Sequence, residues 1–112
     1  MRSESSIQLD FQQAKARADE LDRIASDIRN LANRDVDDAM QQLSRAWQGE
    51  AASQYLQKGG QMKDKMMETV KRLNDTATTI RNTAQRIYDA EMRALELARQ
   101  REYLLQQLLG KK

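Results

Sequence analysis

The chain of 112 residues contains no cysteine, no histidine and no proline. Without cysteine there is no disulfide framework and no thiolate site. Without histidine the chain lacks the usual general base, the commonest metal ligand and every Ser–His or Cys–His arrangement. A metal bundle of the ferritin type, which needs Glu-x-x-His pairs, is excluded for the same reason. We therefore expect no enzyme activity, no bound metal and no cofactor.

Residues that break helices are scarce, because proline is absent and glycine occurs only four times. Aromatic residues make up 4% and hydrophobic residues 39% of the chain. The second value lies below the roughly 45–50% of ordinary globular domains. Most other residues (Ala, Gln, Arg, Leu, Glu, Met) are good helix formers. At this length, the composition predicts one all-α domain whose helices need packing partners.

The charges are mixed: 19 basic and 17 acidic residues alternate along the chain and leave a net charge of +2. Such interleaving is typical of solvated helix faces, whereas nucleic-acid binding usually requires a clustered basic stripe. Residues 1–10 lack the apolar core of a signal peptide, and no apolar run long enough to span a membrane follows. We expect no nucleic-acid partner, no transmembrane segment and, in an exported protein, no cleavable signal peptide.

Apolar residues in the first half recur at spacings of three and four, which is the pattern of one helix face. They are Phe11, Ala14, Ala18, Leu21, Ala25, Ile28 and Ala32, followed at spacings nearer four by Val36, Met40, Leu43 and Trp47. Ile24 and Leu31 widen this stripe. With Asp10, or a serine just before it, as the capping residue, the pattern predicts a helix over residues 10–46 after a flexible segment of residues 1–9.

The second half repeats the pattern over a longer stretch. Its apolar positions are Ala52, Tyr55, Leu56, Gly59, Met62, Met66, Val70, Leu73, Ala77, Ile80, Ala84, Ile87, Ala94, Leu97, Ala98, Leu104, Leu105 and Leu108. This predicts a helix over 50–108 and a tail of 110–112. Gly59 and Gly60, which cost about 1 kcal/mol each relative to Ala, mark either a weak point inside the helix or a kink. We interpret the methionines at 62, 66 and 67 as core filling rather than as an adaptable binding face.

The turn between these helices falls at residues 47–49. Gly49 can adopt the left-handed conformation that ends a helix, and Glu50 suits the first turn of the next one. Such a short linker forces the helices antiparallel, so we predict a two-helix hairpin domain over 10–109. Its wide apolar stripes would be buried by pairing with a second hairpin into a four-helix bundle. The first helix would cover the second only to about Ile87, leaving Tyr88 to Leu109 as an overhang.

Trp47 and Gly49 form a Trp-X-Gly motif at this turn. On their own, a tryptophan here would bury itself at the hairpin end and a glycine would cap a helix. The flanking residues add weight: Leu43 stands four before Trp47, Ala51 and Ala52 follow Gly49, and Tyr55 begins the second helix. In this setting the sequence resembles the Trp-X-Gly family, also called the early-secreted-antigen-like family, of type VII secretion. The resemblance covers the layout from about residue 11 to residue 87.

The resemblance implies a helical-hairpin dimer, with itself or with a similar hairpin, that is made in the bacterial cytoplasm and exported folded by a membrane ATPase. It also implies a role as a secreted effector, as an export partner bound to a toxin's helical N-terminal domain, or as a component that the machine needs. Trp47 and Gly49 would be the export motif, with Leu43, Ala51, Ala52 and Tyr55 packing around it. A cytoplasmic coiled-coil adaptor or structural bundle protein remains the alternative.

The C-terminal signal familiar in this family, Tyr followed four residues later by Asp or Glu, is missing. Met92 follows Tyr88 at that spacing, and Gln107 follows Tyr103. A looser signal described for Gram-positive members of the family consists of hydrophobic residues around an acid. An amphipathic helix end without any signal function shows the same pattern. It is met by Ala98, Glu102, Leu105 and Leu109, and more weakly by Ile87, Glu91, Ala94 and Ala98. We expect the overhang to dock the export ATPase or a toxin domain, with Leu97, Leu104, Leu105 and Leu108 as anchors. The alternative is that this segment folds back or lengthens the bundle of the dimer itself.

Overall fold

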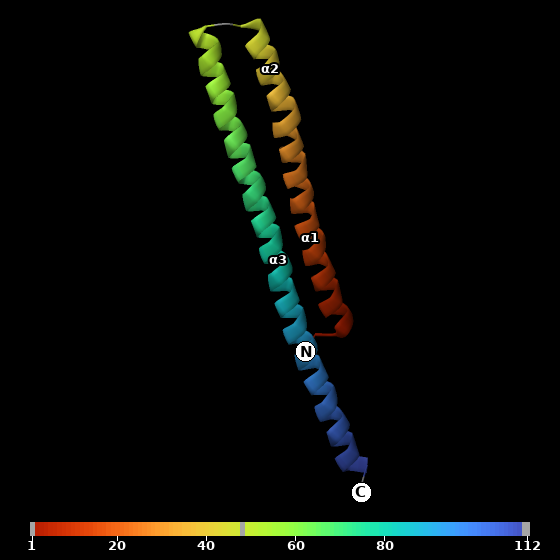
Figure 1. The fold of residues 1–112 in the computed structure, drawn as a ribbon. Helices are drawn as coiled ribbons and strands as arrows, with labels where there is room; N and C mark the ends of the chain where they lie inside the picture. Colours follow the sequence, from red (N-terminus) through yellow and green to blue (C-terminus); the bar gives the residue numbers. More distant parts are fainter. Residues whose placement is uncertain (1, 48, 111–112) are drawn as a thin grey trace. The chain divides into compact units, whose positions relative to one another are not determined.

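The computed structural model describes residues 2–47 and 49–110, and every element in these ranges is helical (Figure 1). The elements are α1 (Glu4–Asn30), the π-helix η1 (Leu31–Val36), α2 (Asp37–Ala46) and α3 (Glu50–Gly110). No strand occurs in the described ranges, and the all-α prediction is confirmed. None of the described helices combines the length and apolar character needed to cross a membrane.

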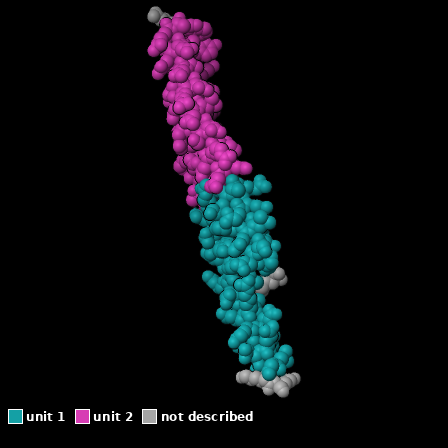
Figure 2. Space-filling model, turned by 90° about the vertical axis from the view of Figure 1, so that its right-hand side faces the viewer, with its two compact units in different colours: residues 1–18, 79–112 teal, residues 19–78 magenta. Residues whose placement is uncertain are grey.

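The chain divides into two compact units, coloured separately in Figure 2. Unit 1 comprises residues 1–18 and 79–112, and unit 2 comprises residues 19–78. In unit 2 the Lys63 ammonium lies 2.8 Å from the Asp37 carboxylate, and Trp47 contacts Tyr55, so the paired helices run antiparallel. In unit 1, Arg99 pairs with Glu4 at 3.0 Å and Tyr88 stacks on Phe11, which again gives antiparallel segments.

Alanines form the most deeply buried positions of the helices. The first half of the chain buries Ala18, Ala25 and Ala32, and α3 buries Val70, Ala77 and Ala84, all at 9% exposure or less. Within each set the residues are seven apart, which keeps them on one narrow line of a helix. Because alanine is small, helix axes can approach closely along this line. The buried face follows one line of each predicted apolar stripe, whereas other members of the stripes are exposed, among them Ile24, Leu31, Met62 and Ile87.

The first helix begins six residues before the predicted start at Asp10. The hydroxyl of Ser3 accepts a hydrogen bond from the Ser6 amide at 3.2 Å, so Ser3 caps the helix. Ile7, four residues before Phe11 and only 2% exposed, anchors this additional turn. Asp10 is not a cap but bonds to the Arg2 guanidinium. The sequence signal for the earlier start was the continuation of the apolar spacing back to Ile7.

The prediction of one uninterrupted α-helix over residues 10–46 was wrong at η1. A regular seven-residue repeat continued through Leu21 and Ile28 would place Asp35 on the buried face. The wider turn of a π-helix takes up one extra residue, so Val36 is half-buried while Asp35 is exposed. Three successive spacings of four, from Ile28 to Met40, were the sign of this insertion in the sequence. The inserted residue thus keeps the Asp35 carboxylate off the buried face of the helix.

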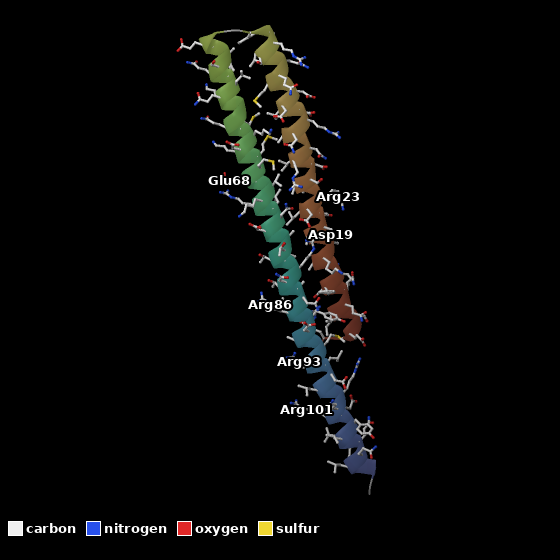
Figure 3. The ribbon with its side chains drawn as sticks, in the orientation of Figure 1. Asp19, Arg23, Glu68, Arg86, Arg93 and Arg101 are labelled. Atoms are coloured by element: carbon white, nitrogen blue, oxygen red, sulfur yellow. The ribbon has the colours of Figure 1, made fainter. Side chains whose placement is uncertain are left out.

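At Gly59-Gly60 α3 continues without interruption, as expected for a weak point inside a helix. A Cβ atom on Gly59 would lie 2.6 Å from the sulfur of Met40, whereas a Cβ on Gly60 would meet nothing within 4 Å. Gly59 therefore makes room for the Met40 side chain within unit 2, and side-chain sulfur atoms lie between the helices there (Figure 3). Glycine at position 59 lowers the helix propensity but allows close packing of Met40 against α3.

Candidate functional site at the Trp-X-Gly turn

The backbone of the turn is set by two hydrogen bonds and one glycine. α2 ends at Ala46, and the Trp47 amide, on an extended residue, donates to the Leu43 carbonyl at 2.9 Å. Gly49 has φ +99°, in the region that favours glycine. Its carbonyl accepts the Ser53 amide at 3.2 Å. Gly49 therefore immediately precedes α3 and lies two residues beyond the C-cap of α2, which is Trp47 rather than the glycine we expected.

The predicted turn of 47–49 includes Gln48, which lies outside the described residues. The boundaries on either side, Ala46 and Glu50, are those expected from the sequence. α3 ends at Gly110, two residues beyond the predicted Leu108, while Lys111 and Lys112 lie outside the described residues.

Trp47 is held in place by one aromatic contact but remains accessible. Its ring packs edge-to-face against Tyr55, with centroids 5.7 Å apart and an interplanar angle of 78°. Exposure is 50% for Trp47 and 55% for Tyr55. Ala52 is buried at 4%, Leu43 is half-buried and Ala51 is exposed. The indole is therefore not buried at the turn, because half of its surface is exposed to solvent.

Unit 2, which contains the turn, also contains an apolar groove. It encloses about 300 Å³ and is lined by Asp35, Val36, Ala39, Met40, Leu43, Gly59 and Met62. Among the described residues no cluster of three Asp, Glu, His or Cys side chains is placed to hold a metal ion. The groove offers van der Waals contact to apolar groups rather than polar chemistry. The turn and groove together have the character of a protein-recognition surface.

A sequence model of the WXG100 family, described as "Proteins of 100 residues with WXG", matches residues 6–92. The chain belongs to this family. The match spans α1, η1, α2, the Trp-X-Gly turn and the larger part of α3, so the resemblance seen in the sequence is confirmed. The WXG100 family is associated with type VII secretion substrates, and its members usually form helical dimers and are secreted without a signal peptide. No curated protein and no solved structure matches the chain.

The acids of the two C-terminal signal patterns in this WXG100 protein, Glu91 and Glu102, differ in their hydrogen bonding. Both carboxylate oxygens of Glu91 accept hydrogen bonds from Arg2 at 3.0 Å. Hydrogen bonds to Asp10 and then to Glu91 raise the pKa of the Arg2 guanidinium above its ordinary value. Glu102 is exposed, and no described residue bonds to it. Of the two candidate signal patterns, only the one around Glu102 therefore has a carboxylate that is not bonded to another described residue.

The hydrophobic members of these patterns are largely open to solvent. Ala98 is half-buried and Ala94 is exposed, and large exposed fractions are found for Leu97 (49%), Ile87 (52%), Leu105 (59%), Leu104 (60%), Leu109 (64%) and Leu108 (66%). They all lie on α3 in unit 1. The structure therefore brings them together along one helix end but places no described segment over the last of them.

The predicted overhang starting at Tyr88 was wrong in its starting point. The Tyr88 ring packs on Phe11 with centroids 4.7 Å apart, and Arg99 pairs with Glu4. Because α1 begins at Glu4 instead of Asp10, it covers α3 for longer, and the overhang begins only after Arg99. Sequence reasoning missed Arg2 and Glu4, whose charges are opposite to those of Glu91 and Arg99. In unit 1, Figure 1 shows the C-terminal end of α3 continuing past the start of α1.

Proposed function

We propose that this WXG100 protein is a type VII secretion substrate or export partner, secreted as a folded helical hairpin paired with a second hairpin. The observation that carries the proposal is the accessible Trp47, held by Tyr55 beside a Gly49 with φ +99°. A tryptophan kept half-exposed has apolar surface left to contribute to a partner, and such anchors contribute strongly to protein recognition. The export ATPase would read this turn. Glu102, to which no described residue bonds, is with its hydrophobic neighbours the candidate C-terminal signal.

Pairing with a second hairpin is supported by apolar side chains that the chain does not cover. In unit 2, Ile24 is 48% and Leu31 is 46% exposed, and they stand seven residues apart on one helix line. Exposed apolar side chains on one helix line can form the contiguous apolar surface that marks a protein interface. The same surface would fit a second copy or a similar hairpin, including the helical N-terminal domain of a toxin.

The pairing is testable by light scattering on the purified chain. At micromolar concentration we expect about twice the monomer mass of 12.9 kDa. The double substitution Ile24→Gln and Leu31→Gln should shift the protein toward the monomer, because it removes apolar area from the contact. Arg29→Gln, at an exposed position nearby, is the matched control and should leave the mass unchanged. A stably folded monomer of the unsubstituted chain, with no tendency to pair with a similar hairpin, would contradict the pairing.

Export itself is tested by comparing strains with and without the membrane ATPase of the secretion system. We expect the full-length, unprocessed chain in the culture supernatant of the first strain and at least a tenfold lower amount in the second. A cytoplasmic marker protein, assayed in both supernatants, controls for lysis. Retention of the chain inside both strains would instead support a cytoplasmic adaptor, and equal amounts in both supernatants would exclude this export route.

A further inference from the structure

The C-terminal end of α3 has an apolar side that the chain leaves uncovered. After Arg99, which pairs with Glu4, every described residue is exposed. Four leucines share one side of this end, here called the leucine face: Leu104, Leu105, Leu108 and Leu109. Each of them is at least 59% exposed. Apolar surface of this kind is typical of a contact with a partner.

Arg101, labelled on α3 in Figure 3, lies at the centre of the leucine face. At about 100° per residue of α-helix, Leu105 and Leu108 lie about 40° and about 20° to opposite sides of it. No described residue pairs with its guanidinium. Burial of an unpaired charge is costly, so a purely apolar partner does not fit this face. The fitting partner offers apolar surface together with an acidic side chain.

The apolar groove of unit 2 has both properties. Asp35 is the charged residue of its lining, and the other lining residues are apolar. The Asp35 carboxylate is exposed and has no partner among the described residues, whereas the nearby Asp37 is held by Lys63. The π-helix η1 brings Asp35 to this position, because its wider turn moves the residue off the buried face. The groove therefore combines apolar surface with an accessible carboxylate.

The groove and the leucine face also agree in length. In the first half of the chain the groove lining runs from Asp35 to Leu43, eight residues apart, which is about 12 Å along a helix. Arg101 and the last leucine, Leu109, are again eight residues and about 12 Å apart. With the two segments parallel and Arg101 level with Asp35, the leucine face therefore spans the groove.

We infer that the leucine face of one copy of this protein packs into the apolar groove of a second copy, with Arg101 bonded to Asp35. The inference rests on the proposed pairing of hairpins and identifies the second hairpin as the same chain. One chain cannot bring the two surfaces together by itself, because α3 carries both Met62 of the groove and the leucine face on one continuous helix. Each copy has one groove and one leucine face, so the exchange is reciprocal and closes a two-fold dimer.

The ion pair sets the register of this contact. A buried pair adds little net stability, but a shifted contact would leave both Arg101 and Asp35 buried without a partner, which is strongly unfavourable. Glu102 lies about 100° around the helix from Arg101, at the edge of the leucine face. It stays accessible in the dimer, so the contact is compatible with a role of Glu102 in the C-terminal signal.

The test is charge reversal, measured as the dissociation constant of the dimer by sedimentation equilibrium. Arg101→Glu and Asp35→Arg should each raise this constant about tenfold or more, because each places two like charges at the contact. The variant with both substitutions restores the pair and should return to within about threefold of the unsubstituted chain. The matched control, Asp38→Arg with Arg93→Glu, reverses exposed charges outside both surfaces and should leave the constant unchanged. Circular dichroism checks that all variants keep their helix content.

Introduced thiols test the register, since the chain contains no cysteine. Ala39 and Leu105 each lie four residues beyond a member of the ion pair and are level with each other in the inferred dimer. A mixture of Ala39→Cys and Leu105→Cys chains should therefore form a covalent dimer on oxidation. Gln107→Cys, on a side of α3 away from the leucine face, is the matched control and should not be linked to Ala39→Cys.

The outcomes separate this contact from the pairing itself. A dimer that neither reversal weakens, or that the double reversal does not restore, overturns the inference and leaves the proposed pairing in place. A chain that pairs only with a similar hairpin, and not with itself, has the same consequence. If Arg101→Glu leaves the dimer intact but lowers export, the leucine face contacts another component of the secretion system and the inference fails. A chain that pairs with neither overturns both.

Discussion

Replacing Trp47 with alanine is expected to reduce export at least tenfold while the helices stay folded. The indole is half-exposed and makes a single aromatic contact, with Tyr55. Removing a fully buried tryptophan costs about 3–5 kcal/mol, so at half exposure we expect a loss of about 2 kcal/mol by the same measure. Export is measured as the amount of chain in the supernatant, and stability by urea unfolding followed by circular dichroism.

The control is Tyr55→Ala, which removes the same ring contact from the other side. We expect this variant to lose a comparable amount of stability but to remain exported, because Tyr55 would support the indole without being read by the ATPase. If Trp47→Ala is folded and reaches the supernatant normally, the residue only packs at the turn. Equal loss of export in both variants would indicate that the aromatic pair acts as one unit and not Trp47 alone.

The second large effect is expected from Ala77→Leu, which enlarges a side chain with no exposed surface. Ala77 lies on the buried line of α3, in the same unit as the equally buried Ala25 and Ala32. A leucine there has no space unless the helix axes move apart, and overpacking of this kind typically costs about 1–3 kcal/mol. We expect a lower midpoint of urea unfolding and a weakened or altered pairing with a second hairpin.

The neighbouring substitution Thr76→Leu is the matched control. Thr76 is exposed, and leucine has the better helix propensity, so we expect stability to stay within about 0.5 kcal/mol of the original, as for ordinary surface substitutions. If Ala77→Leu is as stable as Thr76→Leu, the alanine line does not hold the helices at close distance. The close approach described for this seam would then be wrong.

The turn shows how far local sequence reasoning extends to the candidate site. Its boundaries at Ala46 and Glu50 were predicted correctly, because the apolar period stops there and glycine supplies the one backbone conformation that other residues avoid. The exposure of Trp47 was not predictable, since a tryptophan beside a turn is usually mostly buried. Whether its ring folds inward or packs on Tyr55 depends on which side chains the opposite helix offers.

The sequence alone determined the all-helical class, the position of the turn, the buried stripes and the family. These follow from periodicity, from scarce breakers and from a short motif, all of which act through neighbours in the chain. Only the tertiary structure decided the start of α1 at Glu4, the π-helix that replaces Asp35 by Val36 on the buried face, and the engagement of Glu91 by Arg2. Each of these depends on residues that lie far apart in sequence: burial of Ile7, packing of η1 and α2 against α3 in unit 2, and pairing of opposite charges across unit 1. Local propensity carries no information about such partners, so these features arise only when the helices pack.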